Sequence, residues 1–491
     1  MELKFEKYII PYLQTIAGQM QSQEQTQQIR LTDTMPDVKR IISAWGQVIV
    51  RGKQWLSGSI QVSGGVVAWV LYQGESEDKP QCVETWLPFQ IECEIPNQDR
   101  DGYIKARPFL RSIDARTLSD RKIMVRANVG VMMQAIVSSS AEIYRIDDIP
   151  EDLQILKRSY PVQLPVEAGE KLINIDDVQP PIPNCKLLRC SVLPQLTESR
   201  IVSDKLVMRG NVQLDILLMD EEGKLHKWQP DLPFSQFAQL ETEYNPHATD
   251  SVSFAVTEME MDQNEEGEHR FRCSLLAQYT IYDQKILDIV EDAYSTSRSV
   301  ELKTYKLSLP SLLNEKIHSI QIGSNAQQDE GQIIDVNVLM DDIFMSPEDN
   351  MLRVSPVGIF QILQEDAQGN LNGTVNKWET EFALDNDTDA EVYSSVSLDG
   401  MPIAIGPNIS QQLKLELKSV SASPFTMVCE IELGETRKPD HNRPSLILCK
   451  MEDEDTWSLA KRTGSTVEAI IKANGLKQEP EEGEILLIPI S

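Results

Sequence analysis

The chain has 491 residues, of which 41% are hydrophobic and 25% are charged, a composition typical of folded globular protein, and its length predicts several domains. Its 76 acidic residues outnumber 46 basic ones, which gives a formal net charge of −30. Because such a charge repels phosphate backbones and anionic lipid headgroups, we exclude nucleic acid as an expected partner.

The N-terminal segment, residues 1–34, does not resemble a secretory signal. Charges stand where a signal needs its apolar core, and Pro11 interrupts the nearby apolar run. No stretch approaches the roughly 20 apolar residues that cross a bilayer, so we expect a cytoplasmic protein without a transmembrane segment. Seven cysteines without a C-x-x-C pair are typical of reduced, mostly buried thiols. They are Cys82, Cys93, Cys185, Cys190, Cys273, Cys429 and Cys449.

A glutamine-rich patch, residues 19–28, lies within this N-terminal segment. Its composition is compatible with an extended helix and equally with disorder, and the pattern does not separate the two. We therefore leave residues 1–34 outside the repeated part of the chain and assign them no element.

The first β module is predicted over residues 35–160. Residues 65–72 alternate like a strand, an acidic turn follows at 75–78, and a returning strand at 86–89 ends in an aromatic residue. A second half, residues 116–129, alternates in the same way. The pattern indicates antiparallel hairpins that stack into a sandwich.

The same hairpin recurs in a second module, predicted over residues 185–305. Gly65 and Phe89 are 24 positions apart, and Gly210 and Phe234 are also 24 positions apart. Equal spacing between matching residues is the signature of an internal repeat.

A third, divergent module is predicted over residues 306–435. Its turn is longer, and it lacks the Leu-Pro-Phe sequence of the other two. A tryptophan nevertheless recurs at the start of each returning strand, and a repeated aromatic at one place in a β module indicates packing. The three residues are Trp86, Trp228 and Trp378.

Two proline-containing segments separate these units. Residues 161–184 contain Pro161, Pro165 and a Gln-Pro-Pro-Ile-Pro run, and residues 436–444 are polar with two further prolines. Both patterns are typical of linkers. We therefore expect the last residues, 445–491, to be tethered to the modules rather than fused with them.

The last unit, residues 445–491, is predicted to have strand–helix–helix–strand order. Residues 445–450 form an apolar run, and two short helices follow, opened by the capping residues Asp455 and Ser465 and each closed by a glycine. Residues 484–488 return as a strand. The predicted fold class is thus mainly β, with three tandem antiparallel β-sandwich-like modules followed by a small βααβ domain.

This last unit resembles a LysM domain. Its Asp-Thr-Trp, Thr-Val and Ala-Asn sequences and its closing Leu-Leu-Ile-Pro follow that family's motif nearly end to end. Three β modules before one LysM resemble the SPOCS-domain proteins of spore-forming clostridia, the SipL-like family of spore coat morphogenesis proteins. Residues 35–43 and 121–127 carry that second resemblance, and the two likenesses together cover most of the chain.

The LysM resemblance implies where a ligand is bound. In members that hold N-acetylglucosamine-containing glycans, contacts come from the loop after the first strand and from the loop after the second helix. Residues 452–454 are acidic where the family has Pro-Gly and Gly, and an acidic loop suits a basic patch on a protein. The implied binding residues are Asp455, Thr456, Asn474 and Leu476.

No catalytic or metal site is predicted, and no cofactor. The five histidines are scattered over separate modules without metal-ligand spacing. Cys185 and Cys190 lack the second pair that tetrahedral ligation needs. The chain contains no nucleophile elbow, phosphate loop or zinc-protease helix. The sequence does not exclude a catalytic pair of carboxylates that folding brings together.

Three hypotheses of function follow. The first is a non-enzymatic spore coat assembly scaffold on the mother-cell side of the forespore surface, whose LysM domain binds a coat protein. The resemblance implies the coat-basement ATPase, stage IV sporulation protein A, as that partner, or another coat protein. The second is a peptidoglycan-binding protein of the cell wall or spore cortex. The third is an enzyme whose site is assembled from separate modules.

Overall fold

Strands dominate the computed structural model of the protein, and two short helices lie near its C-terminal end. The sheets are antiparallel throughout. These features confirm the prediction of a mainly β fold. The structure describes residues 2–75, 79–96, 102–179, 185–263, 268–326, 331–348, 351–385, 390–421, 424–436 and 444–490.

The first module is a sandwich of two three-stranded sheets, with strand orders β2-β7-β6 and β3-β4-β5. Alternate residues of β7, such as Ile123, Val125 and Ala127, are fully buried, because alternation places one apolar face of each sheet against the other. The strands are β2 (Glu6–Arg30), β3 (Val38–Leu56), β4 (Ser59–Gly74), β5 (Pro80–Glu94), β6 (Tyr103–Ser119) and β7 (Lys122–Arg145).

The second module repeats this arrangement strand for strand. Its sheets have the orders β8-β14-β13 and β9-β10-β12, and the short β11 pairs with β10 beside β12. The strands are β8 (Leu153–Gln179), β9 (Cys185–Val202), β10 (Lys205–Asp220), β11 (Leu225–Trp228), β12 (Asp231–Gln239), β13 (Thr249–Gln263) and β14 (His269–Ser295).

The third module has the same topology despite its divergent sequence. Its sheets are β16-β22-β21 and β17-β18-β19, and β20 also pairs with β18. The strands are β16 (Ser311–Asn325), β17 (Gln332–Glu348), β18 (Met351–Glu365), β19 (Leu371–Glu379), β20 (Phe382–Asp385), β21 (Ala390–Ile405) and β22 (Asn408–Ser421). Three tandem β-sandwich modules are therefore present, as predicted.

In each of the first two modules, the first strand lies outside the residues predicted for that module. The N-terminal segment is neither helix nor disorder, because β2 pairs with β7 along its whole length. The expected linker 161–184 is wrong up to Gln179, since those residues belong to β8 and pair with β14. Pro161 and Pro165 are tolerated because β8 is an edge strand. Residues 180–184 and 437–443 lie outside the described residues.

A glycine under an aromatic ring marks the same point in each module. A Cβ added at Gly210 would lie 2.1 Å from the Gln195 carbonyl oxygen and 2.7 Å from the Phe234 ring, so only glycine lets the ring lie there. The equivalent cross-strand pairs are Gly64 with Phe89 and Gly358 with Trp378. The first module is thus aligned through Gly64, one residue before the glycine that the spacing indicated.

The three recurring tryptophans do not share one environment. Trp378 is buried, as packing predicts, and takes the place of the aromatic residues above. Trp228 is half-buried against the core of the second module. Trp86 is 37% exposed and lies 5.7 Å from the Arg51 guanidinium.

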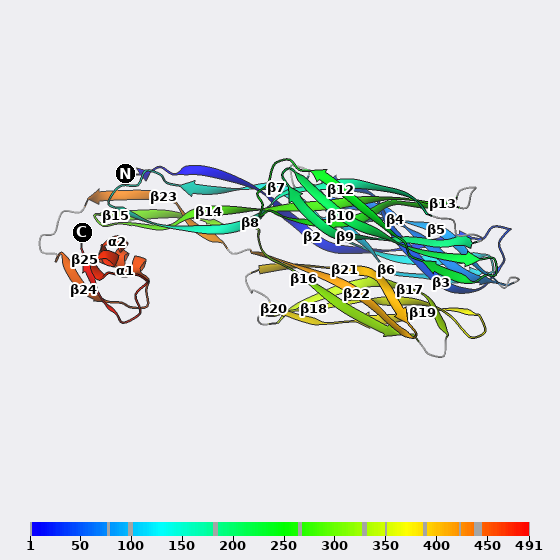
Figure 1. Ribbon diagram of the computed structural model, residues 1–491. Coiled ribbons are helices and arrows are strands. Elements are labelled where there is room, and N and C mark those ends of the chain that lie inside the picture. Colours follow the sequence, from blue (N-terminus) through cyan, green and yellow to red (C-terminus); the bar gives the residue numbers. More distant parts are fainter. Residues whose placement is uncertain are drawn as a thin grey trace.

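The ends of the modules meet in a further β structure that we call the stalk. It contains β1 (Glu2–Leu3), β15 (Arg298–Leu307) and β23 (Phe425–Thr436), ordered β1-β23-β15, together with the outer ends of β2, β7, β8 and β14. Leu3, Ile146 and Val428 share one of its cores. Residues assigned to the second and third modules therefore belong to the stalk, which extends to the left of the modules in Figure 1.

The three modules pack around a common centre in a cyclic order. The second strand of each contacts the fifth strand of the next: β3 contacts β13, β9 contacts β21, and β17 contacts β6. Trp45, Leu217 and Leu363, one from each module, share a buried cluster there. The modules thus form one three-membered body with repeated interfaces, in the manner of a closed cyclic trimer.

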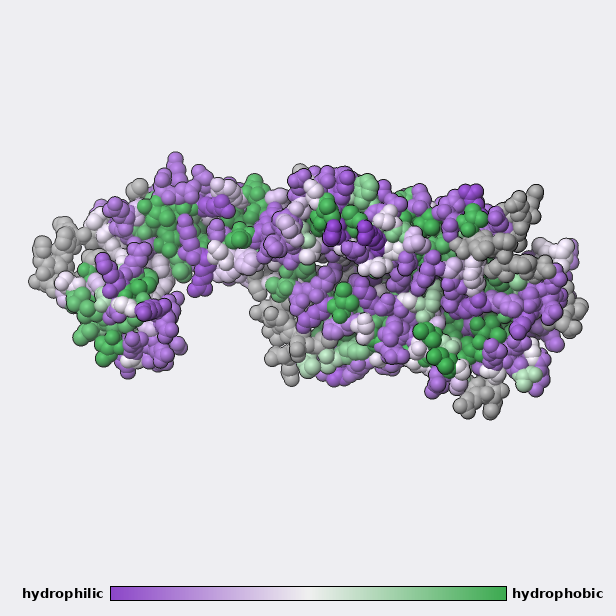
Figure 2. All heavy atoms as spheres, viewed as in Figure 1, coloured by the Kyte–Doolittle hydropathy of each residue, from purple (hydrophilic) through white to green (hydrophobic). Residues whose placement is uncertain are grey.

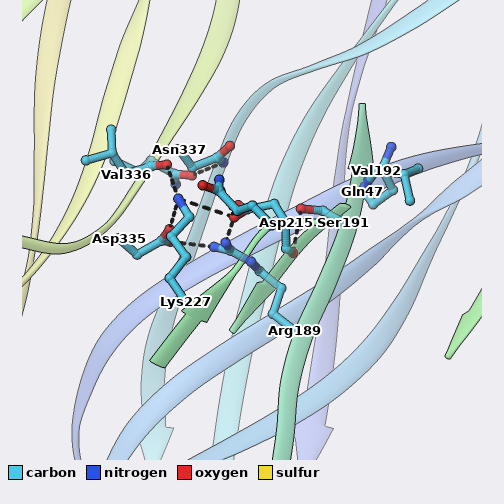
Figure 3. Close-up of polar contacts among 11 residues, drawn as sticks. Gln47, Arg189, Ser191, Val192, Asp215, Lys227, Asp335, Val336 and Asn337 are labelled. Atoms are coloured by element: carbon cyan, nitrogen blue, oxygen red, sulfur yellow. Dashed lines mark hydrogen bonds and ion pairs between the residues drawn. The ribbon is translucent and has the colours of Figure 1, made fainter. Parts of the chain in front are cut away.

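A buried charge cluster joins the modules at this centre (Figure 3). The Arg189 guanidinium lies 2.6 Å from an Asp335 oxygen, bonds Asp215, and lies 4.9 Å from the Trp45 ring. Lys227 Nζ lies 2.7 Å from Asp335. Burial alone would raise the pKa of the Asp335 carboxyl, but the charges of Arg189 and Lys227 outweigh it and hold that pKa well below its usual range.

Candidate partner-binding site

The C-terminal lobe, residues 444–490, has the predicted strand–helix–helix–strand order. Its elements are β24 (Leu446–Lys450), α1 (Thr456–Thr463), α2 (Val467–Asn474) and β25 (Ile485–Pro489). The two strands pair antiparallel. Leu459, Ile470 and Ile488 are fully buried between the helices and this small sheet, so these apolar residues form the core of the lobe.

Local capping sets both helices. The Ser458 N–H donates to the Asp455 carboxylate at 2.8 Å to open α1, and Gly464 ends it with φ 71°. Thr466 caps α2 by accepting from the Ala469 N–H. The expectation of Ser465 as the second cap is therefore wrong by one residue, because Thr466 is the extended residue directly before the helix and Ser465 is buried one position earlier.

The predicted binding residues of the first loop serve the fold. The hydrogen bonds from Ser458 lower the pKa of the Asp455 carboxyl, which keeps this exposed cap ionised. Thr456 is buried, and its hydroxyl and N–H both donate to Glu479, a residue from the loop after α2. Glu479 thus ties the two predicted binding loops to each other.

The predicted binding residues of the second loop are also engaged. Asn474 Nδ2 donates to the Leu487 carbonyl at 2.7 Å, and the Leu487 N–H donates to Asn474 Oδ1 at 2.7 Å. The amide therefore occupies the outer edge of β25. Leu476 is half-buried against the lobe core. The structure brings the two loops together, but it uses the side chains of three of the four residues in hydrogen bonds of the lobe itself.

The lobe is docked on the stalk, so the expectation of a tethered unit is wrong. Trp457 Nε1 donates to Asp292 Oδ2 at 2.9 Å, and Lys461 Nζ lies 2.7 Å from the same carboxylate. The Tyr294 hydroxyl donates to the Ser465 carbonyl at 3.0 Å, and its ring meets Trp457 edge-on. Figure 1 shows the lobe beneath the outer end of β14. Sequence offered no signal for this contact, because the motif places Trp457 in the lobe core.

The side of the lobe away from this contact carries exposed apolar residues. Leu448 is 72% exposed and Ile485 67%, and Leu446 is exposed beside them. In Figure 2 hydrophobic spheres cover the flank of the lobe where Figure 1 labels β24. Such a patch is more than isolated surface leucines, since its members are neighbours on two paired strands.

Acidic side chains crowd one end of this small sheet. The turn after β24 and the approach to β25 are joined there by hydrogen bonds between Met451 and its neighbours Gly483 and Glu484. A basic partner would be attracted to this end. The exposed acidic residues are Glu452, Asp453, Glu481, Glu482 and Glu484.

Elsewhere, no group of three His, Cys, Asp or Glu residues in the described ranges is placed to hold a metal ion. Burial raises the pKa of the Cys82, Cys190 and Cys273 thiols to about 12, so these cysteines are protonated at neutral pH. Tyr160, Glu291 and Phe425 line a shallow depression on the stalk. In that depression the Tyr160 hydroxyl donates a hydrogen bond to the Glu291 carboxylate.

No family model, no curated protein and no solved structure matches the chain. None of the helices in the described residues has the length and apolar character needed to span a membrane. The fold and the lobe together define a multi-module β protein that carries a docked βααβ lobe with an exposed apolar sheet face.

Proposed function

We propose that the protein is a non-enzymatic scaffold of spore coat assembly, located on the mother-cell side at the forespore surface. Its C-terminal lobe, which resembles a LysM domain, binds a coat protein. The observation that carries this proposal is the exposed apolar face of β24 and β25 beside an acidic end. Exposed apolar surface that is contiguous and rimmed by charge marks a protein contact.

The state of the two loops supports a protein ligand over a glycan. A sugar bound between them would need free polar groups there. Thr456 instead bonds Glu479, and Asn474 bonds Leu487. A glycan would first have to break these hydrogen bonds, whereas the apolar face is available without any rearrangement.

The overall shape supports a scaffold role. The stalk holds the lobe at one end of an elongated molecule and the three modules at the other (Figure 1). A second contact region on the modules, which the stalk would hold apart from the lobe, would let one chain join two structures at a fixed spacing. By the resemblance, the coat-basement ATPase, stage IV sporulation protein A, is the partner, or another coat protein.

The test is a binding titration of the full-length chain against that purified ATPase, with sedimentation on purified peptidoglycan as the second arm. The full chain is needed because the lobe rests on Asp292 and Tyr294. We expect ATPase binding and no glycan sedimentation. Sedimentation with peptidoglycan alone would overturn the scaffold assignment in favour of a wall protein.

Charge reversal provides matched variants for this titration. Glu452→Lys with Asp453→Lys should weaken ATPase binding about tenfold, because the acidic end would then repel a basic partner. Glu221→Lys with Glu222→Lys, a pair of exposed acids on a turn of the second module, should leave it unchanged. Equal loss in both double variants would show that only net charge matters.

A further inference from the structure

One edge of the lobe's two-stranded sheet is closed and the other is open. The Asn474 amide bonds both backbone groups of Leu487 on the outer edge of β25. The outer edge of β24 pairs with no strand among the residues that the structure describes, and its Lys450 carbonyl accepts a long contact of 3.7 Å from the neighbouring Cys449 thiol. An unpaired edge of this kind is a template for a further strand.

The pairing pattern identifies the backbone groups that face the open edge. The Ile490 N–H donates to the Ser445 carbonyl and the Met451 N–H donates to the Glu484 carbonyl, at 3.0 and 2.8 Å. In an antiparallel ladder, every second residue directs its backbone N–H and C=O toward a given neighbouring strand, and the residues between them direct theirs to the opposite side. The groups of Leu446, Leu448 and Lys450 therefore point away from β25.

Two of the three exposed side chains lie on the open strand, where an added strand would flank them. Leu448 and Leu446 are on the open strand, and Ile485 is opposite Lys450 on its partner strand. A third strand would extend the apolar face and shield part of these side chains from water. The edge and the face thus point to the same kind of ligand.

We infer that β24 accepts an extended segment of the partner as a third strand, and that this segment carries alternating apolar residues together with basic ones. The inference rests on the proposed function and names the surface and the recognition mode. Backbone hydrogen bonds to Leu446, Leu448 and Lys450 supply affinity, and alternate side chains supply specificity. The acidic end beside the sheet selects basic residues.

A second copy of the chain does not fit this edge. Each copy carries a formal net charge of −30, and the lobe adds five exposed acids next to the sheet. Two such surfaces repel each other. A basic segment of a different protein meets both the apolar face and the acidic end.

Short labelled peptides test the edge directly on the full-length protein by fluorescence anisotropy. The probes are a peptide of alternating lysine and valine, the same peptide N-methylated on every residue, and a peptide of alternating glutamate and valine. We expect the first to bind and the other two to bind at least tenfold more weakly. Equal binding of the N-methylated peptide would overturn strand addition, because that peptide cannot form the ladder.

Two substitutions at one position give matched protein variants. Leu448→Pro removes an N–H that points outward and leaves the bonds to β25 intact, whereas Leu448→Val keeps the N–H. We expect the lysine–valine peptide to lose binding to the Leu448→Pro variant and to retain binding to the Leu448→Val variant. Circular dichroism should show that both variants are folded. Binding that survives in Leu448→Pro would contradict the inference.

The ATPase titration separates the two proposals. If the ATPase binds wild type and Leu448→Pro equally, the scaffold function stands and the edge is not its contact. If the lysine–valine peptide binds at β24 and the ATPase does not bind at all, the edge stands and the proposed partner is wrong. If neither the ATPase nor any peptide binds, both proposals fail.

Discussion

At the residue scale, this protein places opposite charges where several parts of the chain must be held together. Arg189 and Asp335 come from different modules and are almost fully buried. Breaking one partner of a buried ion pair leaves an uncompensated charge, so the loss exceeds what the pair contributes. The cluster therefore fixes how the modules fit more than it adds net stability.

Arg189→Met should lower the free energy of unfolding by about 3–5 kcal/mol, because Asp215 and Asp335 would keep the positive charge of Lys227 but lose that of Arg189. Urea denaturation measures this change. Arg209→Met is the matched control, since its ion pair with Glu198 is exposed and such pairs contribute about 0–1 kcal/mol. A similar small loss in both variants would show that the cluster is not essential.

The carboxyl group of Asp152 should make the stability of the protein depend on pH in the acid range. Hydrogen bonds from Ser297, and then from Arg298 at 2.8 Å, lower the pKa of this carboxyl to about 2. Since the folded-state pKa lies below the unfolded value of about 3.9, the stability it contributes is present above about pH 4 and is lost as pH falls toward 2. The Asp152→Asn variant should have a lower melting temperature than the wild type at pH 7. Its melting temperature should also change less between pH 4 and pH 2, as measured by thermal melts. An unchanged pH profile would contradict this.

At the scale of elements, the strands that alternate and end in recognisable turns were predictable, and those that do not were missed. The hairpin around Gly210 shows both acidic turn and alternation, whereas β2 is rich in glutamine and has no apolar period. Its glutamines work by another route: Gln23 accepts a hydrogen bond from the Gln90 N–H at the edge of the facing sheet. That bond depends on a partner 67 residues away, which a local pattern does not contain.

The candidate site also contains some features that the sequence predicts and others that it does not. Helix capping by Asp455 and the glycine ends were predictable, because they depend on residues within one turn. The roles of Thr456 and Asn474 were not, since each bonds a residue in a different loop or strand. The exposed face of β24 was present in the sequence as an apolar run, but burial on only one side cannot be read from so short a strand.

Gly210→Ala should lower the free energy of unfolding by about 1–3 kcal/mol, because the new methyl group meets a carbonyl oxygen and the Phe234 ring. Gly18→Ala is the matched control in a strand. Its Cβ would have only ordinary contacts at 3.8 Å or more, so it should be neutral or slightly stabilising. Chemical denaturation compares the two, and equal effects would show that the ring does not require glycine.

At the scale of the whole molecule, the lobe, the stalk and the modules form one connected body. The lobe is held by Asp292 and Tyr294 of β14 against Trp457. Both residues belong to the strand that also lines the core of the second module. The orientation of the exposed apolar face of β24 and β25 is therefore set by the stalk.

The double variant Asp292→Ala with Tyr294→Ala should release the lobe from the stalk. We expect a larger maximum dimension in small-angle X-ray scattering and faster proteolysis between the stalk and the lobe. Asp288→Ala, an exposed residue of the same strand, should change neither. A compact profile in the double variant would mean that other contacts hold the lobe.

The stalk also imposes an order on biosynthesis. Its strand β1 begins at Glu2, and the strand it pairs with, β23, ends at Thr436. Glu2 and Leu3 can therefore find their neighbours only after Glu432 has left the ribosome. A product terminated before β23 lacks both the strand that closes the stalk and the exposed apolar face of the lobe.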